Sequence, residues 1–323
     1  MSSIIRKVIR VGERSAGVTI PKEWLSTLGL NIGSAVELIL SRDSITIKPI
    51  EIGRRKLASI LRIKSKNTDE LSRLIIAGYT EGYDTIELDT DKILARRAFY
   101  SVATKLPGSI AMDDVKITIK ISVDELNTSV DEVISSMRSI MLSMFDYFTD
   151  YLDTGNTDYL DQLFRLDDDM DRLHFLGVRT IKITSIKMPL DALDKLMVIK
   201  SLEHIGDCLD RAGRTLLSYK EGLDEKSKRI FKEMFSYLES YTSKSINSYL
   251  SDNYNMALKV LLDRESMLQY IVEAASKCTP LSVAFGIAHE AQMIVALAVE
   301  IAEIAVSKAT RKSFSITSER SRT

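Results

Sequence analysis

The hydrophobic pattern after residue 126 is the feature that most constrains the fold of this chain. Apolar residues recur there at positions i, i+3, i+4 and i+7, which is the period of helices with one buried face. The first such stripe comprises Val130, Val133, Ile134, Met137, Met141, Met144, Phe145 and Phe148. A stretch of this length with a constant helical period predicts an all-α domain at residues 126–310.

Turn-forming residues divide this domain into six expected helices. The breaks lie at Gly155-Asn156, Met188-Pro189, Gly222, Asp252-Asn253 and Thr279-Pro280. The helices are expected at residues 126–152, 158–186, 190–220, 225–250, 254–278 and 281–310. They form two sets of three with similar lengths, which predicts an internally duplicated three-helix bundle. Residues 311–323 are expected to form a flexible tail.

Two pairs of acidic residues stand out on the second and third expected helices. Asp167 and Asp171 are four residues apart on the second helix, and Glu203 and Asp207 have the same spacing on the third. Carboxylates that converge from two helices repel one another, so they need a cation or protons to lie together. A divalent metal ion is therefore one interpretation of these four residues.

A solvated face with local ion pairs is the alternative interpretation. Arg211 and Arg214 follow Asp207 and Asp210 by four residues, which is the spacing of helical salt bridges. His174 shares a helical face with Asp171 and would add a nitrogen ligand if a metal were bound. Both interpretations stay open at the level of the sequence.

The third helix also carries a family resemblance. Its KSLEHIGDCLDRAG stretch, with Glu203-His-Ile-Gly-Asp207, resembles the ERIGD motif of the PhoU family of duplicated three-helix bundles. The resemblance implies a metal site at Asp167, Asp171, Glu203 and Asp207. Oxygen ligands favour Mg²⁺, Mn²⁺ or iron, and a nitrogen ligand favours iron, nickel or zinc. In the second half of the bundle, Gln292 and Ala296 stand at the positions of Glu203 and Asp207, and on the fifth helix Asp263 is followed four residues later by Met267 instead of an acid. The second set of acids is therefore missing, and one metal site per chain is expected.

Residues 1–52 follow a different pattern, of alternation with a short helix. Strands are expected at residues 4–11 and 15–20, and Pro21 opens a helix that spans residues 22–28. AVELILS and SITIKP then form a hairpin that reverses at Arg42-Asp43. The order β-β-α-β-β in so few residues cannot bury a sufficient core, so we expect it to pair with a second copy as a homodimer.

Charge is concentrated in the same region. Residues 1–56 hold ten lysines and arginines against five acidic residues, a net charge of +5, whereas the whole chain has −1 and the remainder therefore −6. A compact basic module in an acidic protein is typical of a binder of phosphate backbones. The alternative is a dimerisation platform whose basic residues only contact solvent.

This module resembles the swapped-hairpin AbrB/SpoVT family of DNA-binding domains. The family's order of motifs is matched by RKVIRVG, GVTIPKEW, LGL, NIGSAVEL and SITIKP, although Ser34 replaces the usual acidic residue. The resemblance implies DNA contacts from the first strand and the loop after it, and a weaker one at the helix start. These positions are Arg6, Lys7, Arg10, Arg14 and, for the weaker contact, Lys22.

Residues 57–122 are expected to form a small α/β domain that follows a linker at residues 54–56. Strands are expected at 57–63, 85–88 and, as a pair, at 110–121, with helices at 69–78 and 91–104. The segment has neither a phosphate-binding glycine loop nor a nucleophile elbow, so we expect it to pack or couple the other parts. The whole chain is thus a multi-domain α+β protein.

The combination resembles archaeal phosphate uptake regulators, in which an AbrB-like part precedes a PhoU-like part. We expect a DNA-binding transcription regulator linked to phosphate uptake or homeostasis. The alternative is an adaptor that does not bind DNA and instead contacts a phosphate transporter or a kinase. No nucleophile has a base beside it, so we do not expect an enzyme. The absence of a leader and the shortness of the apolar run 291–299 predict a cytoplasmic protein that is not inserted in a membrane.

Overall fold

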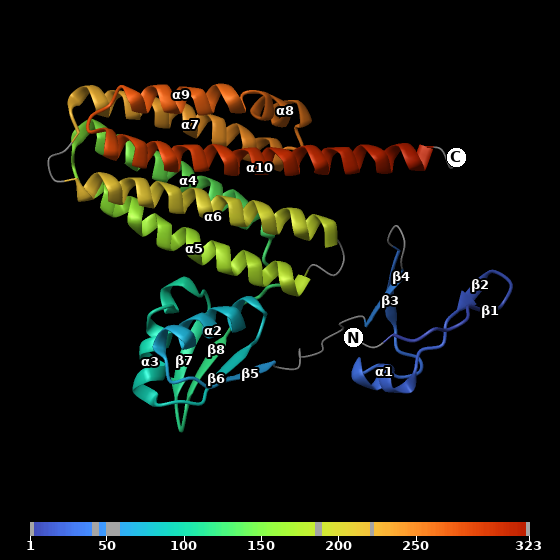
Figure 1. The fold of residues 1–323 in the computed structure, drawn as a ribbon. Coiled ribbons are helices and arrows are strands. Elements are labelled where there is room, and N and C mark those ends of the chain that lie inside the picture. The colour runs from blue at the N-terminus through green and yellow to red at the C-terminus, as the bar shows by residue number, and fades with distance from the viewer. Residues whose placement is uncertain (1–2, 41–44, 50–58, 185–188, 220–222, 321–323) are drawn as a thin grey trace. The chain divides into compact units, whose positions relative to one another are not determined.

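The computed structural model describes residues 3–40, 45–49, 59–184, 189–219 and 223–320. The chain divides into two compact units, residues 1–57 and 58–323, and each is treated separately below (Figure 1). The expected linker at 54–56 and the expected hairpin turn at Arg42-Asp43 lie outside the described residues.

The N-terminal unit has the predicted order β-β-α-β-β. Strands β1 (Ile9–Val11) and β2 (Ser15–Gly17) form one antiparallel pair, and helix α1 (Lys22–Thr27) follows. Strands β3 (Val36–Leu40) and β4 (Ile45–Pro49) form a second antiparallel pair, with Leu38 opposite Ile47. The two pairs are separate two-stranded sheets.

The first two strands are shorter than the sequence pattern predicted. Residues 4–8 and 18–20 have no regular structure, so the predicted strands at 4–11 and 15–20 are reduced to three residues each. A two-stranded ribbon is marginal when no third strand or helix supports it. Within the described residues, β1 and β2 pair only with each other, which explains the reduction.

The α/β part of the second unit contains one mixed sheet in the order β5-β6-β8-β7. Strands β5 (Ile60–Ile63) and β6 (Thr85–Leu88) are parallel, and β8 (Ile117–Ile121) is antiparallel to β6 and to β7 (Ser109–Asp113). Helices α2 (Thr68–Thr80) and α3 (Lys92–Tyr100) bury their apolar faces against one side of this sheet (Figure 1). The helix expected at 91–104 ends at Tyr100, and a 3₁₀ turn, η1, spans Ala103–Lys105.

Side-chain caps explain where several helices begin. The side chain of Asn67 accepts hydrogen bonds from the backbone N–H groups of Asp69 and Glu70 at the start of α2. Asp91 caps α3 in the same way, and Ser129 caps the first helix of the bundle. Each cap satisfies N–H groups that have no partner within the helix.

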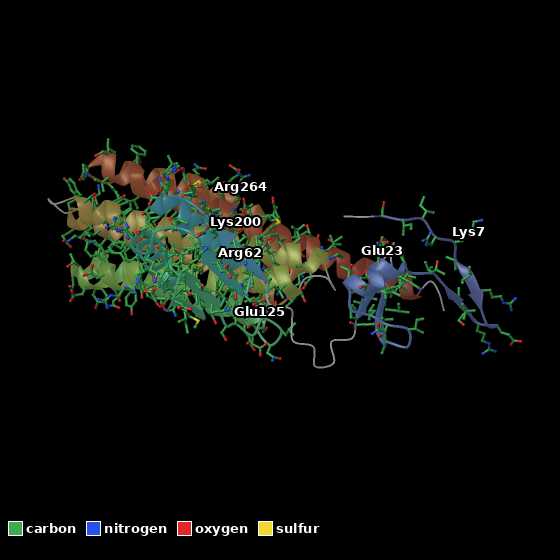
Figure 2. The ribbon with its side chains drawn as sticks, turned by 90° about the horizontal axis from the view of Figure 1, so that it is seen from below. Lys7, Glu23, Arg62, Glu125, Lys200 and Arg264 are labelled. Carbon is green, nitrogen blue, oxygen red and sulfur yellow. The ribbon has the colours of Figure 1, made fainter. Side chains whose placement is uncertain are left out.

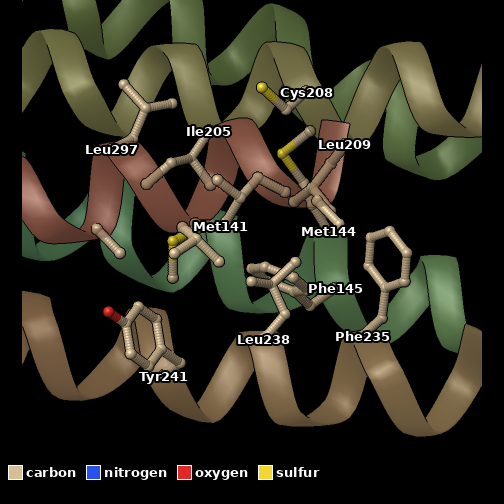
Figure 3. Close-up of a cluster of buried hydrophobic side chains, with 14 of the residues drawn as sticks. Met141, Met144, Phe145, Ile205, Cys208, Leu209, Phe235, Leu238, Tyr241 and Leu297 are labelled. Atoms are coloured by element: carbon tan, nitrogen blue, oxygen red, sulfur yellow. The ribbon is translucent and has the colours of Figure 1, made fainter. Parts of the chain in front are cut away.

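The C-terminal part is the predicted helical bundle. Its helices are α4 (Val130–Thr154), α5 (Asp158–Thr184), α6 (Pro189–Ser218), α7 (Glu225–Leu250), α8 (Tyr254–Leu262), α9 (Arg264–Ser276) and α10 (Leu281–Arg320). Buried side chains from both sets of helices form one continuous core, which includes Met141, Phe145, Leu209, Phe235 and Leu297 (Figure 3). The two expected three-helix sets therefore share a core. None of the helices in the described part of the chain combines the length and apolar character that a bilayer crossing needs.

The fifth and sixth expected helices differ from the prediction. The helix expected at 254–278 is divided at Asp263, whose N–H still donates to the carbonyl of Lys259 while its own carbonyl accepts from Met267. Helix α10 continues to Arg320, so residues 311–320 are helical where a flexible tail was predicted. Ion pairs of Lys308 with Asp252 and of Arg311 with Asp194 support the turns near residue 310.

A buried arginine joins the α/β part to the bundle. Arg179 of α5 is fully buried, and its Nε donates to Oε1 of Glu125 at 2.6 Å. Its Nη1 donates to the backbone carbonyls of Tyr79 and Tyr83, at 2.8 and 2.9 Å, at the end of α2. The segments expected as domains, 57–122 and 126–310, lie within one compact unit, in which each has its own buried core.

We predict that Arg179→Met destabilises this unit by about 3–5 kcal/mol, because it leaves the buried Glu125 carboxylate without its donor and removes a hydrogen bond from the carbonyls of Tyr79 and Tyr83. Denaturant unfolding of the full chain would measure the loss. Lys182→Met is the matched control, since Lys182 pairs with Glu81 of α2 at an exposed position on the same interface, where we expect a loss of about 1 kcal/mol or less. Equal losses in the two variants would contradict the role assigned to Arg179.

Candidate functional site

The five basic residues singled out in the sequence all lie exposed on the N-terminal unit. Arg6 and Lys7 belong to the segment before β1, Arg10 lies in β1, Arg14 in the β1–β2 turn and Lys22 at the start of α1 (Figure 2 labels Lys7). None of the five forms an ion pair within the described part of the chain, so their charges are available to a partner.

The β1–β2 turn positions two of these charges. Gly12 has φ of 74°, a left-handed conformation that favours glycine and that allows the chain to reverse within three residues. Arg10 Nε donates to the carbonyl of Gly12 at 3.0 Å, which holds the guanidinium beside the turn that carries Arg14. The geometry places Arg10 and Arg14 at one end of a short hairpin, with Glu13 between them in the turn.

An uncovered apolar face lies on the same unit. In the β3–β4 hairpin, Leu38 lies opposite Ile47, Leu40 opposite Ile45 and Val36 opposite Pro49. The apolar side chains of these paired positions therefore share one face of the hairpin. Leu38 and Leu40 are 65% and 82% exposed. Among the described residues of this unit only Leu30 is buried. The unit therefore lacks a hydrophobic core of its own within the described chain.

The acidic residues of α5 and α6 lie at the contact between these two helices. A Cβ atom at Gly206 of α6 would lie 3.7 Å from Oδ1 of Asp167 and 3.4 Å from Cγ of Met170, which are ordinary contact distances. The Asp167 carboxylate thus packs against the turn of α6 between Glu203 and Asp207.

Cations of the chain itself contact the outer acids. Lys105 of η1 donates a hydrogen bond from Nζ to Asp171 and lies 4.0 Å from Asp168. Asp207 lies 3.3 Å from Arg211, whose guanidinium also contacts Glu290 of α10 at 3.0 Å.

Asp210 also belongs to the cluster and has a cation of its own. Arg214 holds its carboxylate with two hydrogen bonds, of 2.6 and 2.9 Å. The two helical salt bridges that the sequence offered as an alternative, Asp207 with Arg211 and Asp210 with Arg214, are therefore present.

Burial and mutual repulsion raise the pKa of the two inner carboxyl groups. Burial, followed by the charges of Asp210, Asp207 and Asp171, raises the pKa of Asp167 to about 7. Burial and the charges of Asp207, Asp171 and Asp167 raise the pKa of Glu203 to about 7. Protons therefore neutralise part of this cluster near neutral pH.

Lys105 and His174 respond to the same environment in opposite ways. Burial opposes the charge of Lys105, but the hydrogen bond to Asp171 and the charges of Asp171, Asp168 and Asp167 together outweigh burial and raise the pKa of the ammonium. Burial lowers the pKa of His174 to about 4, so its imidazole is neutral, and its Nδ1 is buried without a hydrogen-bond partner.

Among the described residues, no group of three or more His, Cys, Asp or Glu side chains is arranged to hold a metal ion. Asp171 and Asp207 each share their oxygens with a cation of the chain. Sequence reasoning missed Lys105, because the stretch VATKLPG carries no motif and the contact joins residues 66 positions apart.

Two family models match parts of the chain. Residues 9–55 match the model described as "Antidote-toxin recognition MazE, bacterial antitoxin", and residues 134–215 match the PhoU domain. Together the matches confirm the predicted combination of a MazE/AbrB-type N-terminal segment with a PhoU segment. The PhoU match covers most of α4, all of α5 and most of α6, and it includes all four acids. Comparisons with curated proteins and with solved structures gave no match.

The raised pKa values predict a pH dependence of stability. Asp167 has an ordinary pKa of 3.8 and a pKa of about 7 in the fold, so between these values the folded chain binds more protons than the unfolded chain. The free energy of unfolding should therefore fall as pH rises from about 4 to about 7, by up to about 1.4 kcal/mol per pH unit for one group. Asp167→Asn removes this contribution and should gain in melting temperature over wild type from pH 5 to pH 8.

Melting curves of the full chain in EDTA at several pH values would measure this difference. Asp161→Asn, an exposed change on the same helix, is the control and should give a constant offset from wild type over the same range. A constant offset for Asp167→Asn as well would contradict the assigned pKa.

Proposed function

We propose that this protein is a DNA-binding transcription regulator linked to phosphate uptake. In this proposal the N-terminal unit contacts DNA as a homodimer, and the PhoU-like helical unit senses phosphate status. The observation that carries the proposal is the set of exposed basic side chains on β1, its turn and the segment before it, which form no ion pair with any described residue.

The chemistry of these residues suits a DNA backbone. Arginine and lysine side chains neutralise phosphates, and guanidinium groups also enter grooves whose width and potential they read. The net charge of +5 in residues 1–56 contrasts with −6 in the rest of the chain, so attraction of DNA would be confined to this unit. Two copies in a dimer would double the charge presented to one duplex.

The uncovered hairpin face supports the dimer. Leu38 and Leu40 are apolar and largely exposed, and the matching face of β4 adds Ile45 and Ile47. Burial of apolar surface contributes roughly 25 cal/mol per Å², so pairing of two such faces would complete the missing core. An isologous contact between identical faces is the commonest arrangement in homo-oligomers.

An adaptor function is the second candidate, and a separate observation favours it. Helices α6 and α10 lie side by side, joined by the ion pair of Arg211 with Glu290, and expose Met197, Phe285 and Met293. Flexible methionine side chains suit surfaces that bind proteins. In this alternative the helical unit docks on a transporter or a kinase, and the N-terminal unit only dimerises the chain.

A salt-dependent gel shift with the full chain separates the two functions. We expect affinity for duplex DNA to fall steeply with rising salt, and Arg10→Ala with Arg14→Ala to weaken binding to all sequences. The slope of log affinity against log salt should decrease by about 0.9 for each phosphate contact that is lost. No salt-dependent binding by wild type would leave the adaptor function.

The matched control removes the same charge elsewhere. Arg229→Ala with Arg264→Ala takes two exposed arginines from the helical unit (Figure 2 labels Arg264) and should leave the slope unchanged. If both double variants lose affinity equally, the effect is one of total charge and the basic hairpin is not the DNA surface.

The dimer makes its own prediction. Leu38→Asp with Leu40→Asp should convert the protein to a monomer and abolish DNA binding, because it places charges in the proposed contact. Light scattering after size exclusion would measure the mass. Ile93→Asp, at a position of α3 that is 74% exposed, is the control and should leave the mass unchanged. A dimer that survives both leucine changes would place the contact elsewhere.

A further inference from the structure

Lys105 is held by a well-anchored turn of the α/β part. The residues on either side of η1, Val102 and Leu106, are buried in the core beneath the sheet. The backbone N–H of Lys105 donates to the carbonyl of Val102, and the hydroxyl of Tyr79 donates to the carbonyl of Pro107 at 3.0 Å. The position from which the lysine side chain leaves the backbone is therefore fixed.

The ammonium of Lys105 enters the acidic side of α5. It donates to the Asp171 carboxylate and lies 4.0 Å from Asp168, with the charge of Asp167 also acting on it. The side chains of Lys105 and Asp171 are 34% and 15% exposed, so the contact is only partly open to water. An ion pair in such a position interacts more strongly than one in bulk solvent.

The anchor of the α/β part keeps this contact in place. Eight residues after Asp171, Arg179 binds Glu125 and two carbonyls of the α/β part from within the fold. Lys182 pairs with Glu81 further along α5. Three successive residues of α5, Asp171, Arg179 and Lys182, thus hold the α/β part. Of these contacts, the one between Asp171 and Lys105 involves the acidic cluster.

A divalent ion and this ammonium would compete for the same oxygens. Hard cations bind through carboxylate oxygens, and those of Asp171 already accept from Lys105. Two positive groups held about 4 Å apart would also repel each other. On the α6 side, Arg211 contacts Asp207 and is itself held by Glu290.

We propose that Lys105 takes the place of a divalent metal ion in the acidic cluster of α5 and α6, and that the cluster is the docking site for the α/β part of the same chain. The proposal concerns residues 58–323 and does not depend on DNA binding by the N-terminal unit.

Metal rescue of a lysine variant tests this proposal. The full chain is freed of metal with EDTA and dialysed, and its melting temperature is measured with and without Mn²⁺. Wild type should not respond to Mn²⁺. Lys105→Met should melt several degrees lower, and Mn²⁺ should restore at least half of that loss, because the uncompensated carboxylates then accept a metal.

Further variants locate the effect. Lys182→Met removes a lysine from the same interface but away from the cluster, and should show no rescue. Lys105→Arg keeps a cation and should stay insensitive to Mn²⁺. Rescue of Lys105→Met should vanish when Asp167→Asn and Asp171→Asn are added. If Lys105→Met does not fold, Lys105→Gln also removes the ammonium charge and replaces it in the same experiment.

Three results would overturn the proposal. The first is a wild-type protein that Mn²⁺ stabilises and that loses this response with Glu203→Gln and Asp207→Asn, because lysine and metal would then coexist. The second is a metal-free Lys105→Met variant as stable as wild type, because Lys105 would then not dock the α/β part. The third is a destabilised Lys105→Met variant that Mn²⁺ does not restore.

Discussion

The buried guanidinium of Arg179 is the interaction on which the second unit depends. A charge taken out of water is tolerated only where hydrogen bonds and an opposite charge replace its hydration. Here Glu125 supplies the charge, Asp84 lies 3.6 Å away, and the carbonyls of Tyr79 and Tyr83 supply acceptors at and just beyond the end of α2. The α/β part is therefore bound to α5 in one orientation, and that orientation brings Lys105 to Asp171.

The acidic cluster shows how a chain can hold several carboxylates together with its own groups. Asp171 is contacted by Lys105 from the α/β part, and Asp207 by Arg211 from the next turn of its own helix. Asp167 and Glu203, which are more enclosed, respond by a raised pKa and take up protons. Among the described residues, the counter-charges of this cluster are therefore protons and the side chains of Lys105, Arg211 and Arg214.

Local signals in the sequence predicted most of the fold. The stripe that begins at Val130 and the turn at Gly155-Asn156 act over a few residues, so helices and turns could be located from the sequence. The division of the fifth helix at Asp263 and the extension of α10 depend on packing and on distant ion pairs such as Arg311 with Asp194. Those contacts leave no periodic trace.

The candidate sites also divide into features with a local sequence signal and features that depend on distant contacts. The four acids could be found because their spacing places them on helix faces, and the basic residues because they cluster in a short segment. Lys105 and Arg179 could not be found, since each acts on a part of the fold that is distant in sequence. Whether a carboxylate meets a metal or an ammonium is decided by tertiary structure.

The uncovered hairpin face of the N-terminal unit has a consequence for how the two units unfold. The second unit encloses hydrophobic cores of its own, one in the bundle and one in the α/β part, so its melting temperature should be independent of protein concentration. On the proposed dimer, the N-terminal unit completes its core only with a second copy, and mass action then ties its folded fraction to the concentration of the chain. Such a protein would unfold in two separate steps. Temperature would set the unfolding of the second unit, and the abundance of the chain in the cell would set that of the N-terminal unit.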